Sequence, residues 1–250
     1  MDFQQIVLLS AAFFVVATLY STVGHAGASG YLAMMALVGL APETMRPMAL
    51  TLNILVASFT VYRFRRARFF HWSGLWPFLL GSVPFAAVGG IQSLSRGTYY
   101  VAMGAVLLIA SSYLIWRAFG KRPVMEEGIV KVRKIPAAII GCVIGFLSGL
   151  IGVGGGIFLS PVLLILGWAG PKTTAGISAP FILVNSAVAL AAGSLAAQTL
   201  PSELPLLAVA ALAGAFLGTW LGLERFKQKG LLTTLAVVMT LAGAKLILTA

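Results

Sequence analysis

Two glycine-rich segments contain residues that could bind a small ligand. Residues 24–30 read Gly-His-Ala-Gly-Ala-Ser-Gly, and residues 152–156 read Gly-Val-Gly-Gly-Gly. A short apolar run follows each segment, at 28–40 and at 157–168. A helix that starts after such a break presents N–H groups without helical partners and the positive end of its dipole. Because glycine lets a ligand approach the backbone closely, these helix starts could bind an oxyanion without a buried cation.

Polar side chains near the breaks extend this candidate site. Asn53 and Asn185 follow the two breaks at comparable distances, and a buried amide must find hydrogen-bond partners. His25 is either a substrate or proton contact or a structural donor. The alternative for the glycines is that they only allow close helix packing. The predicted substrate-binding residues are Gly24, His25, Gly27, Ser29, Asn53, Gly152, Gly154, Gly155, Gly156, Ser178 and Asn185.

The composition places these segments in a membrane. Of the 250 residues, 60% are hydrophobic and 9% are charged, whereas a soluble domain has about 25% charged residues. Apolar runs inside a bilayer must be helices, and the alternating strands of a barrel are absent. At about 20 residues per span, the length allows about eight crossings. We therefore expect an all-α, polytopic integral membrane protein without a separate soluble domain.

The apolar runs divide the chain into long and short elements. The runs 28–40 and 157–168 contain 13 and 12 residues. As helices they reach only about 20 Å, short of the roughly 30 Å hydrocarbon core. We expect each to return within a hairpin, at 3–40 and at 136–168; the alternative is one long broken helix in each region. The remaining spans are predicted at 44–62, 73–91, 98–116, 174–197, 204–222 and 231–248.

The cations indicate the orientation. They cluster at 63–68, 117–134 and 225–229, and together with Lys172 these clusters place 14 of the 17 Lys and Arg residues in the cytoplasm if the loops face inward. Arg46, Arg96 and Lys245 are left over. The crossings between clusters must then be even in number, which favours the hairpins and puts both termini outside. The net charge of +11 therefore indicates orientation, and we expect no nucleic-acid partner.

The two halves repeat each other by position. Gly24 corresponds to Gly152, and residues 41–44 correspond to residues 170–173, at offsets of 128 and 129. The basic loop follows the second element in the first half and the third element in the second half, which predicts two repeats of inverted topology, each starting with a glycine-broken hairpin. The predicted units are a first repeat at 1–117, a basic cytoplasmic linker at 118–135 and a second repeat at 136–250.

Several chemistries are not expected. Cys142 is the single cysteine, which excludes an internal disulfide and a cysteine-based metal site. All six acidic residues fall at predicted termini or loops, so no carboxylate relay lies in a span. Ser148 lies in a Gly-Phe-Leu-Ser-Gly stretch that lacks the Gly two residues before a nucleophilic serine. We expect no catalytic residues, no cofactor and no bound metal, and therefore no enzyme.

The motifs resemble a known family. Residues 145–161 and 171–178, together with the first-half segments 20–30 and 41–53 and the loop 63–68, resemble the sulfite exporter family TauE/SafE. The resemblance covers essentially the whole chain. It implies a permease of the bacterial inner membrane that exports sulfite, sulfoacetate or related anions. The chain departs from the family pattern at 24–27, where Gly-His-Ala-Gly replaces a run of three glycines.

We therefore predict a permease for a small anion. The expected substrates are sulfite, sulfoacetate, thiosulfate or similar anions, moved outward down the membrane potential by uniport or by weakly coupled efflux. The expected partners are this substrate and membrane lipids, and assembly into a homo-oligomer stays open. The alternatives are an importer of a small organic or sulfur-containing anion, and a membrane scaffold that transports nothing.

Overall fold

The computed structural model describes residues 3–119, 127–128, 130–194, 200–224, 240, 243–244 and 246–248, and its regular elements are helices. Within this part of the chain there is no strand, only an isolated bridge between Val130 and Ala169. The all-α prediction is confirmed. The helices are α1 (Phe3–Ser21), α2 (Ala28–Leu37), α3 (Pro42–Arg66), α4 (Trp72–Ile91), α5 (Arg96–Phe119), α6 (Lys134–Ile151), α7 (Gly156–Ile165), α8 (Pro171–Ser194) and α9 (Leu204–Glu224).

The polytopic character is also confirmed. Six helices of the described residues are long and apolar enough to cross a membrane, namely α1, α3, α4, α6, α8 and α9. Helix α5 and the run 231–248 stay predicted spans, and most of 231–248 lies outside the described residues. Large apolar side chains are exposed on the outer faces, such as Ile135, Ile139, Leu206, Val209 and Phe216. An apolar exterior of this kind suits contact with lipid.

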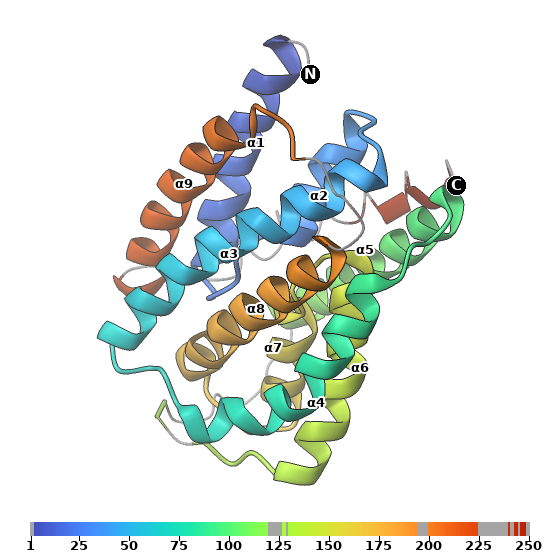
Figure 1. The fold of residues 1–250 in the computed structure, drawn as a ribbon. Coiled ribbons are helices and arrows are strands. Elements are labelled where there is room, and N and C mark those ends of the chain that lie inside the picture. Colours follow the sequence, from blue (N-terminus) through green and yellow to red (C-terminus); the bar gives the residue numbers. More distant parts are fainter. Residues whose placement is uncertain are drawn as a thin grey trace.

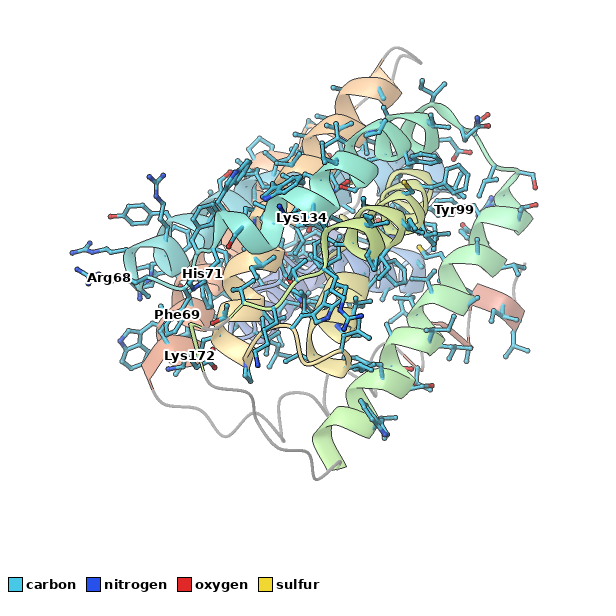
Figure 2. The ribbon with its side chains drawn as sticks, turned by 90° about the horizontal axis from the view of Figure 1, so that it is seen from below. Arg68, Phe69, His71, Tyr99, Lys134 and Lys172 are labelled. Atoms are coloured by element: carbon cyan, nitrogen blue, oxygen red, sulfur yellow. The ribbon has the colours of Figure 1, made fainter. Side chains whose placement is uncertain are left out.

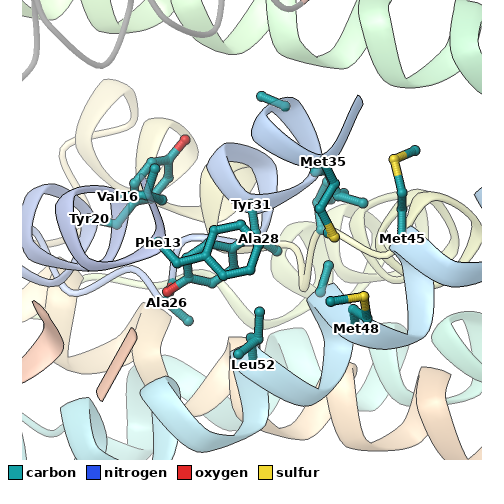
Figure 3. Packing of buried hydrophobic residues seen from close by; sticks show 14 of the residues in the cluster. Phe13, Val16, Tyr20, Ala26, Ala28, Tyr31, Met35, Met45, Met48 and Leu52 are labelled. Carbon is teal, nitrogen blue, oxygen red and sulfur yellow. The ribbon is translucent and has the colours of Figure 1, made fainter. Parts of the chain in front are cut away.

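Helices α2 and α7 are short, with 10 residues each, which corresponds to about 15 Å. Helix α2 folds back along α1. The rings of Phe13 and Tyr31 lie 4.8 Å apart, and Gly30 lies directly against Val16. Figure 3 shows this returning arm packed against Met48 and Leu52 of α3.

Glycines set the close packing of two pairs of long helices. In each pair the contacts advance four residues at a time along both helices, so the two helices run in the same direction. Between α6 and α4, Gly141 lies against Phe78, Gly145 against Ser82 and Gly149 against Ala86. Between α9 and α1, Gly214 lies against Phe14, Gly218 against Thr18 and Gly222 against Thr22.

Helix α8 also runs in the same direction as α4, because Gly74 lies against Ile177 and Gly90 lies against Ala189. Helices α6 and α8 therefore run the same way, and the chain between them returns through α7 to the end where α6 began. Figure 1 shows α3 and α8 antiparallel through the centre, with α1 and α9 on one side and α4 and α6 on the other.

This arrangement collects the described loop cations at one end. The end of α3 and the starts of α4, α6 and α8 meet there, with Arg63, Arg65, Arg66, Arg68, Lys131, Arg133, Lys134 and Lys172. Figure 2 shows Arg68, Phe69, His71 and Lys172 together and Tyr99 at the opposite end. The Lys172 Nζ lies 5.6 Å from the centroid of the Phe69 ring, so the start of α8 contacts the loop between α3 and α4.

Candidate functional site

The two glycine breaks are built from left-handed backbone. Gly24 and Gly27 have φ angles of 80° and 106°, and Gly152, Gly154 and Gly155 have φ angles of 90°, 75° and 80°. Side chains with a Cβ are strained in this region, which is why the chain needs glycine here. Gly27 and Gly155 are the N-cap residues of α2 and α7. All eleven predicted site residues are buried.

Each break packs against the long central helix of the other half. Gly24 lies against Ala175 of α8, whereas Gly152 lies against Arg46 of α3. Gly154 lies where a side chain would collide with Asn53 and with Ser186 of α8. The structure therefore brings both breaks, α3 and α8 together in one buried region.

Asn53 holds the start of α2. Its Oδ1 accepts a hydrogen bond from the Ala28 N–H at 3.1 Å, and its Nδ2 donates to the Ser186 Oγ at 3.2 Å. The N-cap residue Gly27 has no side chain to cap the helix, so a distant helix supplies the capping oxygen. Asn53 thus joins the first break to α8.

His25 joins the two breaks directly. Its Nε2 lies 2.6 Å from the Ser160 Oγ of α7, and Ser160 lies 2.9 Å from the Ser178 Oγ of α8. Ser29 pairs within its own hairpin, with its Oγ 2.7 Å from the Tyr20 hydroxyl. Of the side chains predicted for the site, His25 and Ser178 therefore share one hydrogen-bonded chain, and Ser29 belongs to a separate pair.

Asn185 has a different environment from Asn53. Its Nδ2 donates to the Phe181 carbonyl one turn earlier at 2.8 Å. Its Oδ1 is buried without a hydrogen-bond partner among the described residues. The two asparagines, which the sequence places as a related pair, have unlike roles: one caps a helix, and the other presents a free acceptor.

The start of α7 lacks a side-chain cap of the kind that Asn53 gives to α2. Phe158 and Leu159 donate their N–H groups to the Gly155 carbonyl. The N–H groups of Gly156 and Ile157 have no acceptor among the described residues. In α2 the first N–H is taken by Asn53, and the N–H groups of Ser29 and Gly30 have no acceptor among the described residues. Each break therefore leaves two N–H groups at its helix start without an acceptor in the described part of the chain.

Sequence reasoning missed the role of the half-buried Arg46. Arg46 donates from Nη1 to the Gln92 carbonyl at 2.8 Å and from Nη2 to the Gly90 and Gly149 carbonyls at 2.6 and 2.7 Å. It also reaches the Gly89 carbonyl. Arg46 thus binds the carboxyl ends of α4 and α6, where a cation offsets the negative ends of the helix dipoles. Its position inside an apolar run could have identified it, because ionisable residues in such runs are rare and are usually paired or functional.

Acidic groups stay away from the breaks. The described carboxylates lie at helix ends and in loops, at Glu43, Glu127 and Glu203. Glu127 accepts hydrogen bonds from the backbone of Lys172 and Thr173 at the start of α8. Groups of acidic, His or Cys side chains that could hold a metal ion are absent from the described residues. The buried donors at the second break therefore suit an anion better than a cation.

The chain is similar to known proteins along nearly its whole length. The family model described as "Sulfite exporter TauE/SafE" matches residues 9–246. A Sinorhizobium fredii protein named "Probable membrane transporter protein y4hK" is 36% identical over 240 residues, which cover 96% of this chain and 97% of that protein. A Bacillus subtilis protein named "Probable membrane transporter protein YunE" is 26% identical over 190 residues, 68% of either chain. No solved structure gives a significant match.

Proposed function

Because this chain belongs to the sulfite exporter TauE/SafE family of membrane transporters, we propose that it is a permease that exports a small oxyanion across the bacterial inner membrane. Sulfite is the first candidate substrate, and sulfoacetate and thiosulfate share its chemistry. The single observation that carries the proposal is the start of α7. There, two backbone N–H groups without acceptors face a fully buried glycine break, and such a helix start binds oxyanions.

The proposed transport cycle uses two repeats of inverted topology, at 1–117 and 136–250, each opening with a glycine-broken hairpin. The exchanged contacts support this division. Gly24 packs on Ala175, and Gly152 packs on Arg46. The two glycines are 128 positions apart and their two partners are 129 positions apart, which are the same offsets that relate the sequence motifs. Helices α1, α3 and α9 run opposite to α6, α8 and α4. Halves related in this way can alternate access to a site between them.

The proposed orientation places the basic end in the cytoplasm. The cations of the described loops lie at that end of the bundle, in agreement with the positive-inside rule. Both termini would then be extracytoplasmic. With the cell interior negative, each negative charge that leaves gains about 2.3 kcal/mol per 100 mV. Export can therefore proceed as a uniport, without a carboxylate relay.

Sulfite efflux from proteoliposomes tests the function. We expect efflux that accelerates with an inside-negative potential and slows when the potential is collapsed. An efflux rate that is independent of the membrane potential would refute the uniport. Net uptake of sulfite against the membrane potential would favour the importer. Absence of flux for every oxyanion tested would leave only a scaffold role.

A pair of glycine variants tests the site. Gly155→Ala places a methyl group against Phe181 and Ile144 at a φ of 80°, and we expect it to abolish efflux. Gly39→Ala is the matched control, because Gly39 also has a φ of 80° but has no atom within 4 Å of the added methyl group. Efflux that is lost equally in both variants would show that backbone strain, and not the site, is responsible.

A further inference from the structure

Arg46 lies at the end of the bundle that faces away from the basic loops. It is in the second turn of α3, and it bonds the carbonyl of Gln92, which ends α4. Helix α3 ends and helix α4 begins at the basic end, so Arg46 is at the opposite end. Ionisable residues in apolar runs are rare and are usually paired or functional. The position of Arg46 over the second break gives it a role beyond offsetting helix dipoles.

The second break starts at the level of Arg46 and leads into the bundle. A methyl group on Gly152 would lie 2.9 Å from the Arg46 Cγ, whereas Gly154 lies against Asn53. Asn53 follows Arg46 by seven positions on α3, which is about two helical turns, or about 10 Å, toward the basic end. The Arg46 side chain therefore covers the end of the break that faces away from the basic loops.

The bonds at this end join the two halves of the chain. The Arg46 Nη2 donates to the Gly90 carbonyl of α4 at 2.6 Å and to the Gly149 carbonyl of α6 at 2.7 Å. Tyr99 of α5, which Figure 2 shows at this end, donates its hydroxyl to the Ile151 carbonyl at 2.8 Å, directly before the break. Helices α3 and α5 of the first half thus hold the end of α6, which belongs to the second half.

The equivalent position in the second half carries an alanine. The offset of 129 that relates the sequence motifs takes Arg46 to Ala175. Ala175 is also the residue that contacts the first break, because it lies against Gly24 as Arg46 lies against Gly152. A methyl group forms no hydrogen bond and carries no charge. The first break is therefore covered at this position by a methyl group, and the second break by a guanidinium group that bonds four carbonyls.

The cation at the start of α8 is Lys172, and its contacts are weaker than those of Arg46. Its Nζ donates to the Leu223 carbonyl of α9 at 3.2 Å and lies 5.6 Å from the centroid of the Phe69 ring. A flexible ammonium group gives one bond here, where the planar guanidinium group of Arg46 gives several. Helices α8 and α9 both belong to the second half, so this bond does not cross between the halves.

We propose that Arg46 is the extracytoplasmic gate of the permease: its bonds hold this end closed, so that the second break receives its anion from the cytoplasm. This inference rests on the proposed function and its orientation. When two halves alternate access, closing one side and opening the other are the same change. Stronger bonds at the extracytoplasmic end therefore bias the equilibrium toward the state that is open to the cytoplasm. This bias suits an exporter, whose substrate arrives from that side.

The chemistry of Arg46 also lets the substrate open the gate. The Arg46 Nε is buried without a hydrogen-bond partner among the described residues, and its Nη atoms are bonded only to neutral carbonyls. An oxyanion pairs more strongly with a guanidinium group than a carbonyl does, because both partners are charged. An anion that leaves the break can therefore replace the carbonyls as the partner of Arg46, which releases the ends of α4 and α6.

Hydrogen–deuterium exchange of the protein in lipid nanodiscs, measured by mass spectrometry, tests the gate. We expect Arg46→Met to exchange about tenfold faster at residues 149–157, because the loss of one bond to a charged group shifts an opening equilibrium by about that factor. Residues 20–27, at the first break, should exchange more slowly, because the shifted equilibrium closes the cytoplasmic side. A loss of stability alone would accelerate the exchange at both breaks.

Two further variants keep the test sharp. Lys172→Met is the matched control, because it also removes a cation from a carbonyl near a helix end, but at the basic end. We expect its exchange at residues 149–157 to stay unchanged or to fall. Tyr99→Phe removes the single bond to the Ile151 carbonyl. It should change both breaks in the same directions as Arg46→Met, to a smaller extent, and it decides the matter if Arg46→Met does not fold.

The outcomes separate the gate from the permease. Faster exchange at both breaks in Arg46→Met, or unchanged exchange at residues 20–27, would overturn the gate and leave Arg46 a structural role only. Faster exchange at residues 149–157 in Lys172→Met would overturn it as well. None of these results affects the permease proposal, which is tested by sulfite efflux with the unaltered protein. If that protein moves no oxyanion while the exchange changes as expected, the permease proposal fails and the alternation of the two ends stands.

Discussion

Replacing Asn53 with alanine tests how the first break is held. The Asn53 Oδ1 is the acceptor for the Ala28 N–H at the start of α2, and the residue has no exposed surface. Removing it leaves a buried donor unsatisfied, which costs about 1–3 kcal/mol. The space left by the amide adds about 1 kcal/mol in a close-packed region. We therefore expect Asn53→Ala to lower the free energy of unfolding by about 2–4 kcal/mol.

A double-mutant cycle separates the capping bond from the bond to α8. The Asn53 Nδ2 donates to the Ser186 Oγ at 3.2 Å, and one neutral hydrogen bond contributes about 0.5–1.5 kcal/mol. We expect a coupling energy in this range between Asn53→Ala and Ser186→Ala. The larger part of the Asn53 effect should remain in the Ser186→Ala background, because the cap on α2 is independent of Ser186.

The assay is reversible unfolding of the purified protein in detergent, followed by tryptophan fluorescence. Thr60→Ala is the control on the same helix, because its hydroxyl is equally buried and bonds the Val56 carbonyl within α3. Its loss should cost at most about 1 kcal/mol. The reasoning is refuted if Asn53→Ala is no more destabilising than Thr60→Ala.

Three further predictions concern the packing around the site. Gly145→Ala drives a methyl group into the backbone of Ser82, and we expect a loss of thermal stability of about 2 kcal/mol or more, whereas a side chain at Gly39 meets open space. Arg46→Met leaves four carbonyls at the ends of α4 and α6 without their cation, and we expect lower thermal stability and slower efflux. Arg46→Lys should rescue both only in part, because its single nitrogen cannot replace the several donors of the guanidinium group. Glu127→Gln weakens the acceptor at the start of α8, and we expect about 1 kcal/mol of lost stability, measured by the same unfolding assay.

The helices could be predicted well because their signals are local. The predicted run 73–91 corresponds to helix α4 (Trp72–Ile91), and the predicted run 136–151 corresponds to helix α6 (Lys134–Ile151). Helix α3 extends to Arg66, beyond its predicted end at 62. Hydropathy underestimates this helix because its last turn is basic, and a cation near a helix carboxyl end is favourable.

The sequence did not predict how the candidate site residues are connected. The breaks, His25, Asn53 and Asn185 all lie in one buried region, but their partners Ser160 and Ser186 were not among the predicted site residues. Serines are common in such helices, and nothing in their spacing separates one that pairs across the molecule from one that bonds its own helix.

The sequence by itself determined the environment and the breaks of this protein. Its apolar runs require helices in a membrane, and its glycines require left-handed turns at two places. Its loop cations indicate which ends of the helices lie on the same side of the membrane. Only the tertiary structure decided which polar atoms are satisfied. His25 finds its partner 135 residues away and Asn53 finds Ser186 at 133 residues. Such pairs arise when the helices pack, and this packing gives the start of α2 a side-chain acceptor in Asn53.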